Sequence, residues 1–149
     1  MKNFILFLIL LSTFSLSSCF SDYLYVTNED PNVPTSYSGR PVDVQGTVYV
    51  ESRSVTFYVW DSGTIDDDNV TLVVNGTTIL SNYTLTGDKK AVSTTLSNYG
   101  YNYILLYANN EGTIPPNTCA ISIDDGYSEQ TLTLSANLST NGAYNIYVQ

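Results

Sequence analysis

A cluster of acidic residues is the first feature of this chain whose side chains could do chemistry. Four carboxylates, at Asp61, Asp66, Asp67 and Asp68, fall within eight positions, and Asn69 follows them. Calcium is bound by about six to eight oxygen atoms from carboxylates, amides and carbonyls. The spacing predicts a calcium site formed by Asp61, Asp66, Asp68 and Asn69, and the alternative is a solvated acidic turn.

Two further acids bear on the same cluster. Asp124 and Asp125 would complete the calcium site if their loop lies at the same end of the domain. Paired acids also allow a remote alternative, a carboxylate-dependent glycosidase, which needs two carboxylates about 5–10 Å apart across a cleft. We expect no enzyme, because the acids gather in one turn and the chain has no His to act as a general base.

Aromatic residues form the second group of candidate site residues. Tyr101, Tyr103 and Tyr107 share one parity of a predicted strand, while Tyr58 and Trp60 lie opposite the apolar residues of another. Aromatic rings exposed in this way stack against sugars or contact a protein partner. The alternative is ordinary packing, with the rings covered by loops or by the N-terminal segment.

The charge of the chain excludes one class of partner. The formal net charge is -9, from 14 acidic and 5 basic residues. Nucleic-acid binding needs clustered Lys and Arg. We therefore expect no nucleic-acid partner.

The N-terminus has the pattern of an export signal. Lys2 precedes an apolar run over 4–11, and small residues follow as far as Ser18. The run is shorter than the ~20 residues that a membrane-spanning helix needs. Residues 1–18 are thus predicted to be a signal peptide.

Leu16-Ser17-Ser18-Cys19 resembles the lipobox of bacterial lipoproteins. The resemblance implies cleavage before Cys19 and acylation of its thiol. It also implies a lipid anchor in the cell envelope, at the outer membrane or cell surface because position 20 is Phe and not Asp. The alternative is an ordinary secretion signal that leaves Cys19 free to pair with Cys119. Cys119 itself alternates with Ile121 and Ile123 and is expected in the core.

The remaining chain predicts an all-β fold. Residues 19–45, with several Pro and no sustained periodicity, are interpreted as the acylated cysteine and a flexible tether, and 46–149 as the domain. About nine strands are expected, which indicates an antiparallel β-sandwich with an immunoglobulin-like or jelly-roll outline. Turns are predicted at Asn75-Gly76, Asp125-Gly126 and Asn141-Gly142. The predicted strands follow the alternating runs at 42–50, 55–59, 70–74, 77–80, 91–96, 101–108, 119–123, 131–136 and 144–148.

The stretches Val59-Trp60-Asp61-Ser62-Gly63-Thr64-Ile65-Asp66-Asp67-Asp68-Asn69-Val70 and Tyr107-Ala108-Asn109-Asn110-Glu111-Gly112-Thr113-Ile114-Pro115-Pro116-Asn117-Thr118 resemble a β-sandwich module of secreted and cell-surface bacterial proteins. Val74-Asn75-Gly76 and Ile123-Asp124-Asp125-Gly126 extend the resemblance over about 55–148. Asp67 stands where the module suggests Gly, and Cys119 where it suggests a small residue such as Ala. The resemblance implies architecture and an extracytoplasmic location, and no particular activity.

Together these features predict a lipid-anchored, extracytoplasmic, non-catalytic binding module. Its expected ligand is an extracellular glycan or a partner protein, and its membrane contact is the N-terminal lipid. The alternative is a structural envelope lipoprotein without a soluble ligand.

Overall fold

The computed structural model describes residues 33–149, and the predicted signal peptide, Cys19 and most of the expected tether lie outside this range. This part of the chain contains strands and no helix. Accordingly, it includes no helix that is long and apolar enough to span a membrane. The strands are β1 (Ser36–Tyr37), β2 (Arg40–Val50), β3 (Ser54–Trp60), β4 (Asn69–Val74), β5 (Thr77–Thr84), β6 (Lys90–Thr95), β7 (Gly100–Ala108), β8 (Asn117–Asp124), β9 (Glu129–Ala136) and β10 (Asn141–Val148).

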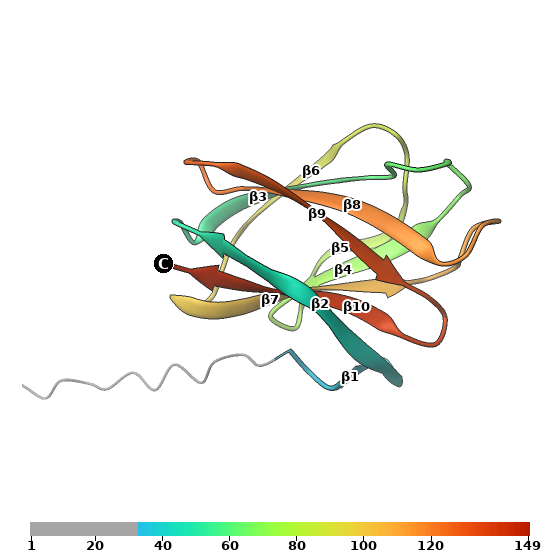
Figure 1. The fold of residues 1–149 in the computed structure, drawn as a ribbon, viewed down its shortest axis with the longest axis horizontal. Coiled ribbons are helices and arrows are strands. Elements are labelled where there is room, and N and C mark those ends of the chain that lie inside the picture. The colour runs from blue at the N-terminus through green and yellow to red at the C-terminus, as the bar shows by residue number, and fades with distance from the viewer. Residues whose placement is uncertain (1–32) are drawn as a thin grey trace, which may run out of the picture.

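The strands form two sheets that pack face to face as a β-sandwich (Figure 1). One sheet has six strands in the order β1-β2-β10-β7-β4-β5, and the other has four in the order β6-β3-β8-β9. Every pair is antiparallel except β2 with β10, which run parallel. The predicted all-β sandwich is confirmed, and the parallel pair is the one departure from an antiparallel fold.

Alternation along the strands produces the core. In β3, Val55, Phe57 and Val59 are buried between the sheets, while the residues between them face outward. In β7, Ile104 and Leu106 do the same. One side of each strand is therefore apolar and packs against the opposite sheet. This packing removes apolar surface from water, which stabilises the fold by about 25 cal/mol per Å² buried.

All nine expected strands are present, although the N-terminal boundary of the domain differs from the prediction. The interpretation of 19–45 as a tether is wrong for residues 36–45, which form β1 and the start of β2. Pro41 contributed to the wrong interpretation, because proline has no backbone N–H to donate to a neighbouring strand and is therefore uncommon in strands. Pro41 is tolerated here because it pairs only with Ser36 of the short edge strand β1, while pairing with β10 begins at Val42.

Two of the three predicted turns are found. Asn75 and Gly76 have φ values of 48° and 80° and join β4 to β5, and Gly126 has a φ of 84° in the β8–β9 turn. The predicted turn at Asn141-Gly142 is wrong, because these residues begin β10. The turn lies just before them, where the Asn137 side chain accepts hydrogen bonds from the backbone N–H groups of Ser139 and Thr140 at 2.7 Å each.

Candidate functional site

The acidic loop connects β3 to β4 and is held by the segment that connects β7 to β8. Asn110 donates to the Asp67 carbonyl at 2.9 Å and accepts from the Asn69 N–H at 2.7 Å. The buried Asn117 amide donates to the Asn69 and Asn110 carbonyls, at 3.3 Å each. The two stretches that carry the module resemblance therefore pack on each other and fix the loop.

Asp67 supports this loop in another way. Its φ is 68°, in the left-handed region that favours glycine and that Asp and Asn tolerate better than most residues. Asp67 occupies the position at which the resemblance suggests Gly. The backbone conformation thus explains why either residue is compatible with the loop.

Three of the four expected calcium ligands line one pocket. Asp61, Asp66 and Asp68 line an open pocket of about 190 Å³, together with Ser62, Gly63, Thr64, Ile114, Pro116 and Thr118. Asp61 and Asp68 are almost fully buried, with 7% and 4% of their surface exposed. The acidic loop thus lines a pocket with two buried carboxylates and is not a fully solvated turn.

Backbone amides fix each of these carboxylates. Gly63 N–H donates to Asp61 Oδ1 at 2.7 Å. Thr113 and Ile114 donate to Asp66 Oδ2 at 2.9 and 2.6 Å. Thr118 N–H donates to Asp68 Oδ2 at 3.2 Å. Charged acceptors make short, strong hydrogen bonds with amides, so these interactions set the directions of the three side chains.

Asp68 is the most constrained of the three. Its Oδ1 is buried and has no hydrogen-bond partner among residues 33–149. Burial raises the pKa of the Asp68 carboxyl above its usual range, the Thr118 hydrogen bond opposes this, and the nearby charges of Asp66, Asp61 and Glu111 add to the increase.

The fourth expected ligand and the two auxiliary acids lie elsewhere. The Asn69 side chain bonds to Thr84 and Asn109, at 3.1 and 2.8 Å, and does not line the pocket. Asp124 pairs with the beginning of β3, whereas Asp61 follows the end of that strand. The suggestion that Asp124 and Asp125 complete the site is therefore wrong. No three acidic or Cys side chains in the described chain are spaced as a preformed metal site.

The expected aromatic residues divide between the two sheets and do not form one face. Tyr58 and Trp60 lie in β3 of the four-stranded sheet, and Tyr101, Tyr103 and Tyr107 in β7 of the six-stranded sheet. The predicted parity is confirmed, since both groups face away from the core between the sheets. A single surface containing all five is excluded by the topology.

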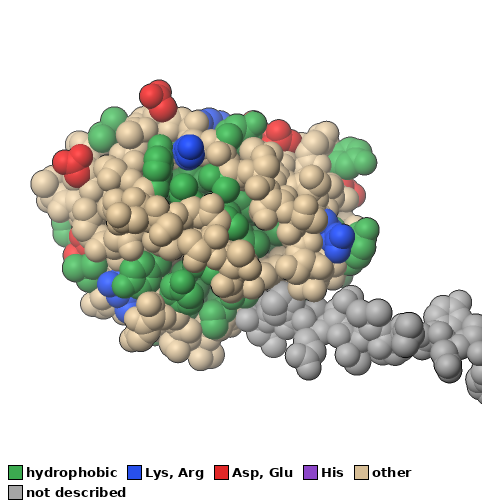
Figure 2. Space-filling view, turned by 180° about the vertical axis from the view of Figure 1, so that it is seen from behind, with side chains coloured by type: hydrophobic (Ala, Val, Ile, Leu, Met, Phe, Trp, Pro, Cys, Tyr) green, Lys and Arg blue, Asp and Glu red, His purple; other side chains and the backbone are tan. Residues whose placement is uncertain are grey.

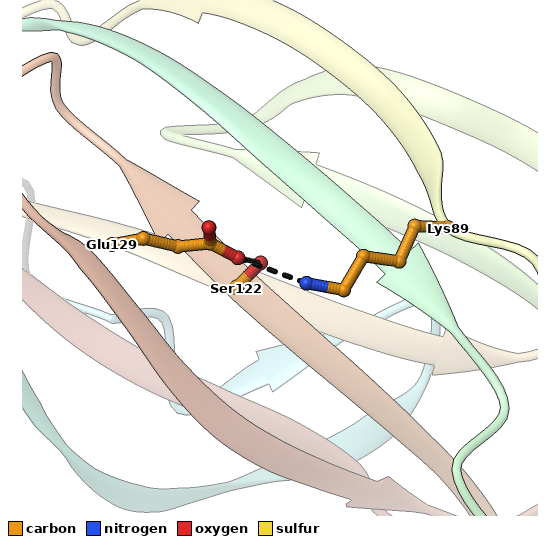
Figure 3. A network of polar contacts seen from close by, with 3 residues as sticks. All are labelled: Lys89, Ser122 and Glu129. Atoms are coloured by element: carbon orange, nitrogen blue, oxygen red, sulfur yellow. Dashed lines mark hydrogen bonds and ion pairs between the residues drawn. The ribbon is translucent and has the colours of Figure 1, made fainter.

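A lysine covers the aromatic pair of the four-stranded sheet. Lys89 Nζ lies 4.6 Å from the centre of the Trp60 ring and 5.7 Å from that of Tyr58. The same ammonium forms an ion pair with Glu129 at 2.9 Å, and Glu129 also accepts a hydrogen bond from Ser122 (Figure 3). Hydrogen bonds from Ser122 and Lys89 lower the pKa of the Glu129 carboxyl. These rings already have a cationic partner within the chain.

On the six-stranded sheet, the N-terminal segment covers one part of the outer face. Tyr103 and Leu105 are buried there with Val73 and Ala143, and the partly buried residues Val33, Tyr37, Val42 and Tyr107 pack on them. Arg40 lies 4.2 Å from the centre of the Tyr107 ring. Tyr103 and Tyr107 therefore serve packing, and Tyr103 is only 7% exposed.

A row of three tyrosines lies on a part of that face that residues 33–149 leave at least partly exposed. Tyr147 of β10 is the register partner of both Tyr49 in β2 and Tyr101 in β7. The ring centres are 5.9 Å apart for Tyr49–Tyr147 and 4.8 Å for Tyr101–Tyr147. Tyr49 and Tyr101 are 55% and 44% exposed. These three residues are called the tyrosine row below.

Neutral polar residues adjoin the tyrosine row. Asn145 is paired with Thr47, one outward-facing position along the same strands. Neither side chain forms a hydrogen bond within residues 33–149, and Thr47 is exposed. The alternation of buried and exposed positions could have identified four of these residues as outward-facing, because each is next to a buried aliphatic residue in the sequence. They are Tyr49, Tyr147, Thr47 and Asn145. Their alignment depends on strand order, which the sequence does not provide.

Cys119 is buried in the core, as expected, and forms no disulfide within residues 33–149. Burial raises the pKa of its thiol, and the charges of Asp61 and Asp68 add to the increase. A nucleophilic role is disfavoured, because the thiolate is the reactive form.

Comparisons of the chain with protein-family models, curated proteins and solved structures find no match.

Proposed function

We propose that the protein is a lipid-anchored, extracytoplasmic, non-catalytic binding module that recognises a neutral extracellular glycan through the tyrosine row. The observation that carries this proposal is the alignment of Tyr49, Tyr147 and Tyr101 on three adjacent strands, with two of the rings about half exposed. Aromatic rings on a rigid sheet offer apolar surface to sugar rings, and their phenol groups add hydrogen bonds.

The residues beside the row support a neutral ligand. Thr47 and Asn145 provide a hydroxyl and an amide with unused hydrogen-bonding capacity in the described structure. An amide both donates and accepts, which suits sugar hydroxyls. Figure 2 shows one side of the molecule, on which charged side chains are few and scattered among neutral polar and hydrophobic ones. The three tyrosines of the row, Thr47 and Asn145 are all uncharged at neutral pH, so they offer no charged group to a charged polysaccharide.

The anchoring part of the proposal rests on Cys19 and is tested separately. A Cys19→Ala variant is expected to leave the membrane fraction and to lose the acyl mass, because the thiol that carries the lipid is absent. Retention of the variant in the membrane fraction would disprove lipid anchoring through this residue. Glycan recognition would be unaffected by either result.

Glycan binding is tested with a panel of neutral polysaccharides, followed by calorimetry with the best ligand. Tyr49→Ala and Tyr101→Ala should each weaken binding about fivefold to thirtyfold, since one stacking contact contributes roughly 1–2 kcal/mol. Tyr127→Ala is the matched control, because Tyr127 is 80% exposed in the turn between β8 and β9 of the other sheet. Equal affinity for all four proteins, or no binding across the panel, would overturn the proposal.

One observation favours the structural alternative. The segment at Val33 and Tyr37 already covers Tyr103 and Leu105 on the same outer face, so part of this face serves folding. A photo-crosslinking residue at position 101 in intact cells separates the two functions. Crosslinks to one envelope protein, together with a negative glycan panel, would assign the tyrosine row to a structural assembly.

A further inference from the structure

We propose that the parallel strands β2 and β10 form a mechanical clamp, which resists force applied between the N-terminal side of the domain and the far end of the sandwich. The source of this force rests on the proposed function, because a lipid at Cys19 would hold one end while a ligand on the tyrosine row holds the other. The clamp itself is a property of the strand pairing. It can therefore be tested without lipid or glycan, and its failure would leave both of those proposals standing.

The points at which force enters lie at opposite ends of this strand pair. The chain enters β2 at Arg40, and β10 is followed by Gln149. Figure 1 shows β1 at one end of the sandwich and the C-terminus at the other. The tyrosine row lies toward the C-terminal end, because Tyr49 and Tyr147 form the pair next to the last one in the register. A pull from the N-terminal side against the row or the C-terminus thus runs along both strands.

Parallel pairing loads the bonds between β2 and β10 in shear. The register extends from Val42 with Asn141 to Val50 with Val148, which covers almost the full length of both strands. Hydrogen bonds between parallel strands are evenly spaced. They share the load when the start of one strand is pulled against the end of the other. An antiparallel pair that is pulled apart at one end loses its bonds one at a time, so the clamp should need the larger force.

Contacts at both ends of the pair oppose sliding of one strand past the other. At the start of β2, the Asn141 amide donates to the carbonyls of Tyr37 and Arg40 at 2.8 and 3.4 Å. At the far end, the Gln149 N–H donates to the Val50 carbonyl at 2.9 Å. A shift of the register by one residue would exchange the buried and outward faces of a strand, since side chains alternate. The pair therefore cannot slip in single steps.

The N-terminal segment 33–41 should detach before the clamp is loaded. Within it, β1 forms two register pairs with β2 in an antiparallel hairpin, which a pull on the N-terminus opens from its end. Release of this segment lengthens the chain by at most about 30 Å, at roughly 3.3–3.6 Å per residue. The load then passes to Val42 and the clamp. We expect one short extension, followed by rupture of the rest of the domain at higher force.

Single-molecule pulling in two directions tests the clamp. The full chain is held by tags at its two termini, and a Cys19→Ala chain is held through Ser54→Cys and Thr95→Cys. The last two positions are exposed register partners on the antiparallel strands β3 and β6, and the native Cys119 is buried. The rupture force between the termini should be about twofold higher or more, because bonds in shear break together. An equal or lower force between the termini would overturn the proposal.

Two equivalent core substitutions assign the resistance to this strand pair. Ile146 of β10 and Ile121 of β8 are both fully buried in the same core cluster. Ile146→Val and Ile121→Val should lower stability in denaturant to a similar extent, because each removes one buried methylene. Ile146→Val should also lower the rupture force between the termini, whereas Ile121→Val, which lies outside the loaded pair, should leave it unchanged. Forced unfolding is governed by the unfolding rate, so the two measurements are independent. Equal rupture forces for the two variants would disprove the clamp.

Discussion

The side chain of Gln45 pairs with the backbone of Ser135 as a neighbouring strand would. Gln45 Nε2 donates to the Ser135 carbonyl at 2.7 Å, and Ser135 N–H donates to Gln45 Oε1 at 3.0 Å. Gln45 is the extra residue of a bulge in β2, because Val44 and Gly46 pair with consecutive residues of β10. The bulge thus releases one side chain, which joins the six-stranded sheet to β9 of the other sheet.

Replacing Gln45 should lower the free energy of unfolding by more than its partly exposed position suggests. Gln45→Leu removes both hydrogen bonds and leaves two partly buried backbone groups of Ser135 unpaired, so we expect a loss of about 2 kcal/mol in the free energy of unfolding. Gln45→Glu should be similarly unstable because a carboxylate cannot donate to the Ser135 carbonyl. Denaturant unfolding measures the loss. Gln130→Ala, which removes one exposed bond to the Tyr49 carbonyl, is the control and should lose less. Similar losses for all variants would show that the reciprocal pair has no special role.

Gly142 permits this pairing by having no side chain. A Cβ atom at position 142 would overlap the Ser135 carbonyl oxygen and lie 2.9 Å from Gln45 Nε2. We expect Gly142→Ala to lose about 3 kcal/mol or more, or to fail to fold, because backbone must move. At Gly87 a new Cβ would meet only Ile65 Cδ1, at 3.4 Å. Gly87→Ala should therefore stay within about 1 kcal/mol of the unmodified chain. Comparable melting temperatures for both variants would contradict the packing described for β9 and β10.

Asp125 gives the fold a predictable dependence on pH. Burial raises the pKa of its carboxyl, but hydrogen bonds from the N–H groups of Glu51, Ser128 and Tyr127 outweigh burial and lower it overall. The unfolded chain therefore binds this proton at a higher pH than the folded chain does. The contribution of Asp125 is complete above the unfolded pKa of about 3.9 and is lost as the pH falls through the lower folded value.

Asp125→Asn is the variant that tests this dependence. At neutral pH it should lose about 2 kcal/mol, because an amide replaces a charged acceptor of three hydrogen bonds. The difference from the unmodified chain should shrink as the pH falls below about 4, where the Asp125 carboxyl of the unfolded chain begins to protonate while that of the folded chain is still charged. Unfolding curves at several pH values measure both effects. Asp43→Asn, at an exposed position of β2, serves as control. A difference that stays constant or grows on acidification would contradict the assigned sign.

Local patterns in the sequence predict much of this fold, and long-range pairings explain what they miss. Alternation located all nine expected strands, and Asn75-Gly76 located the β4–β5 turn, because both signals depend on neighbouring residues. Asn141-Gly142 gives the same turn signal for another reason. Its glycine is required by the approach of β9 to β10, and no local pattern distinguishes the two causes.

The candidate sites follow the same distinction. Asp61, Asp66 and Asp68 are close in sequence, so their meeting in one pocket could be predicted from a single loop. Asn69 turns away because Thr84 and Asn109, from other elements, bind its side chain. Tyr49, Tyr101 and Tyr147 come together only through the order β2-β10-β7, which includes a parallel pair between distant strands.

Cys119 follows Thr118, which lines the acidic pocket, and its side chain belongs to the hydrophobic core. Its reactivity therefore reports on the packing of the core next to the pocket. Cys119 is fully buried, and burial together with the charges of Asp61 and Asp68 raises the pKa of its thiol, so both access and thiolate formation are suppressed. In a Cys19→Ser chain, which keeps only this thiol, we expect no labelling by a disulfide reagent under native conditions at mildly alkaline pH. One thiol per chain should react after denaturation. Slow native labelling would measure local opening of β8, since the reagent reaches only the open state. Rapid stoichiometric labelling of the folded chain would show that Cys119 is accessible and would contradict its burial in the core.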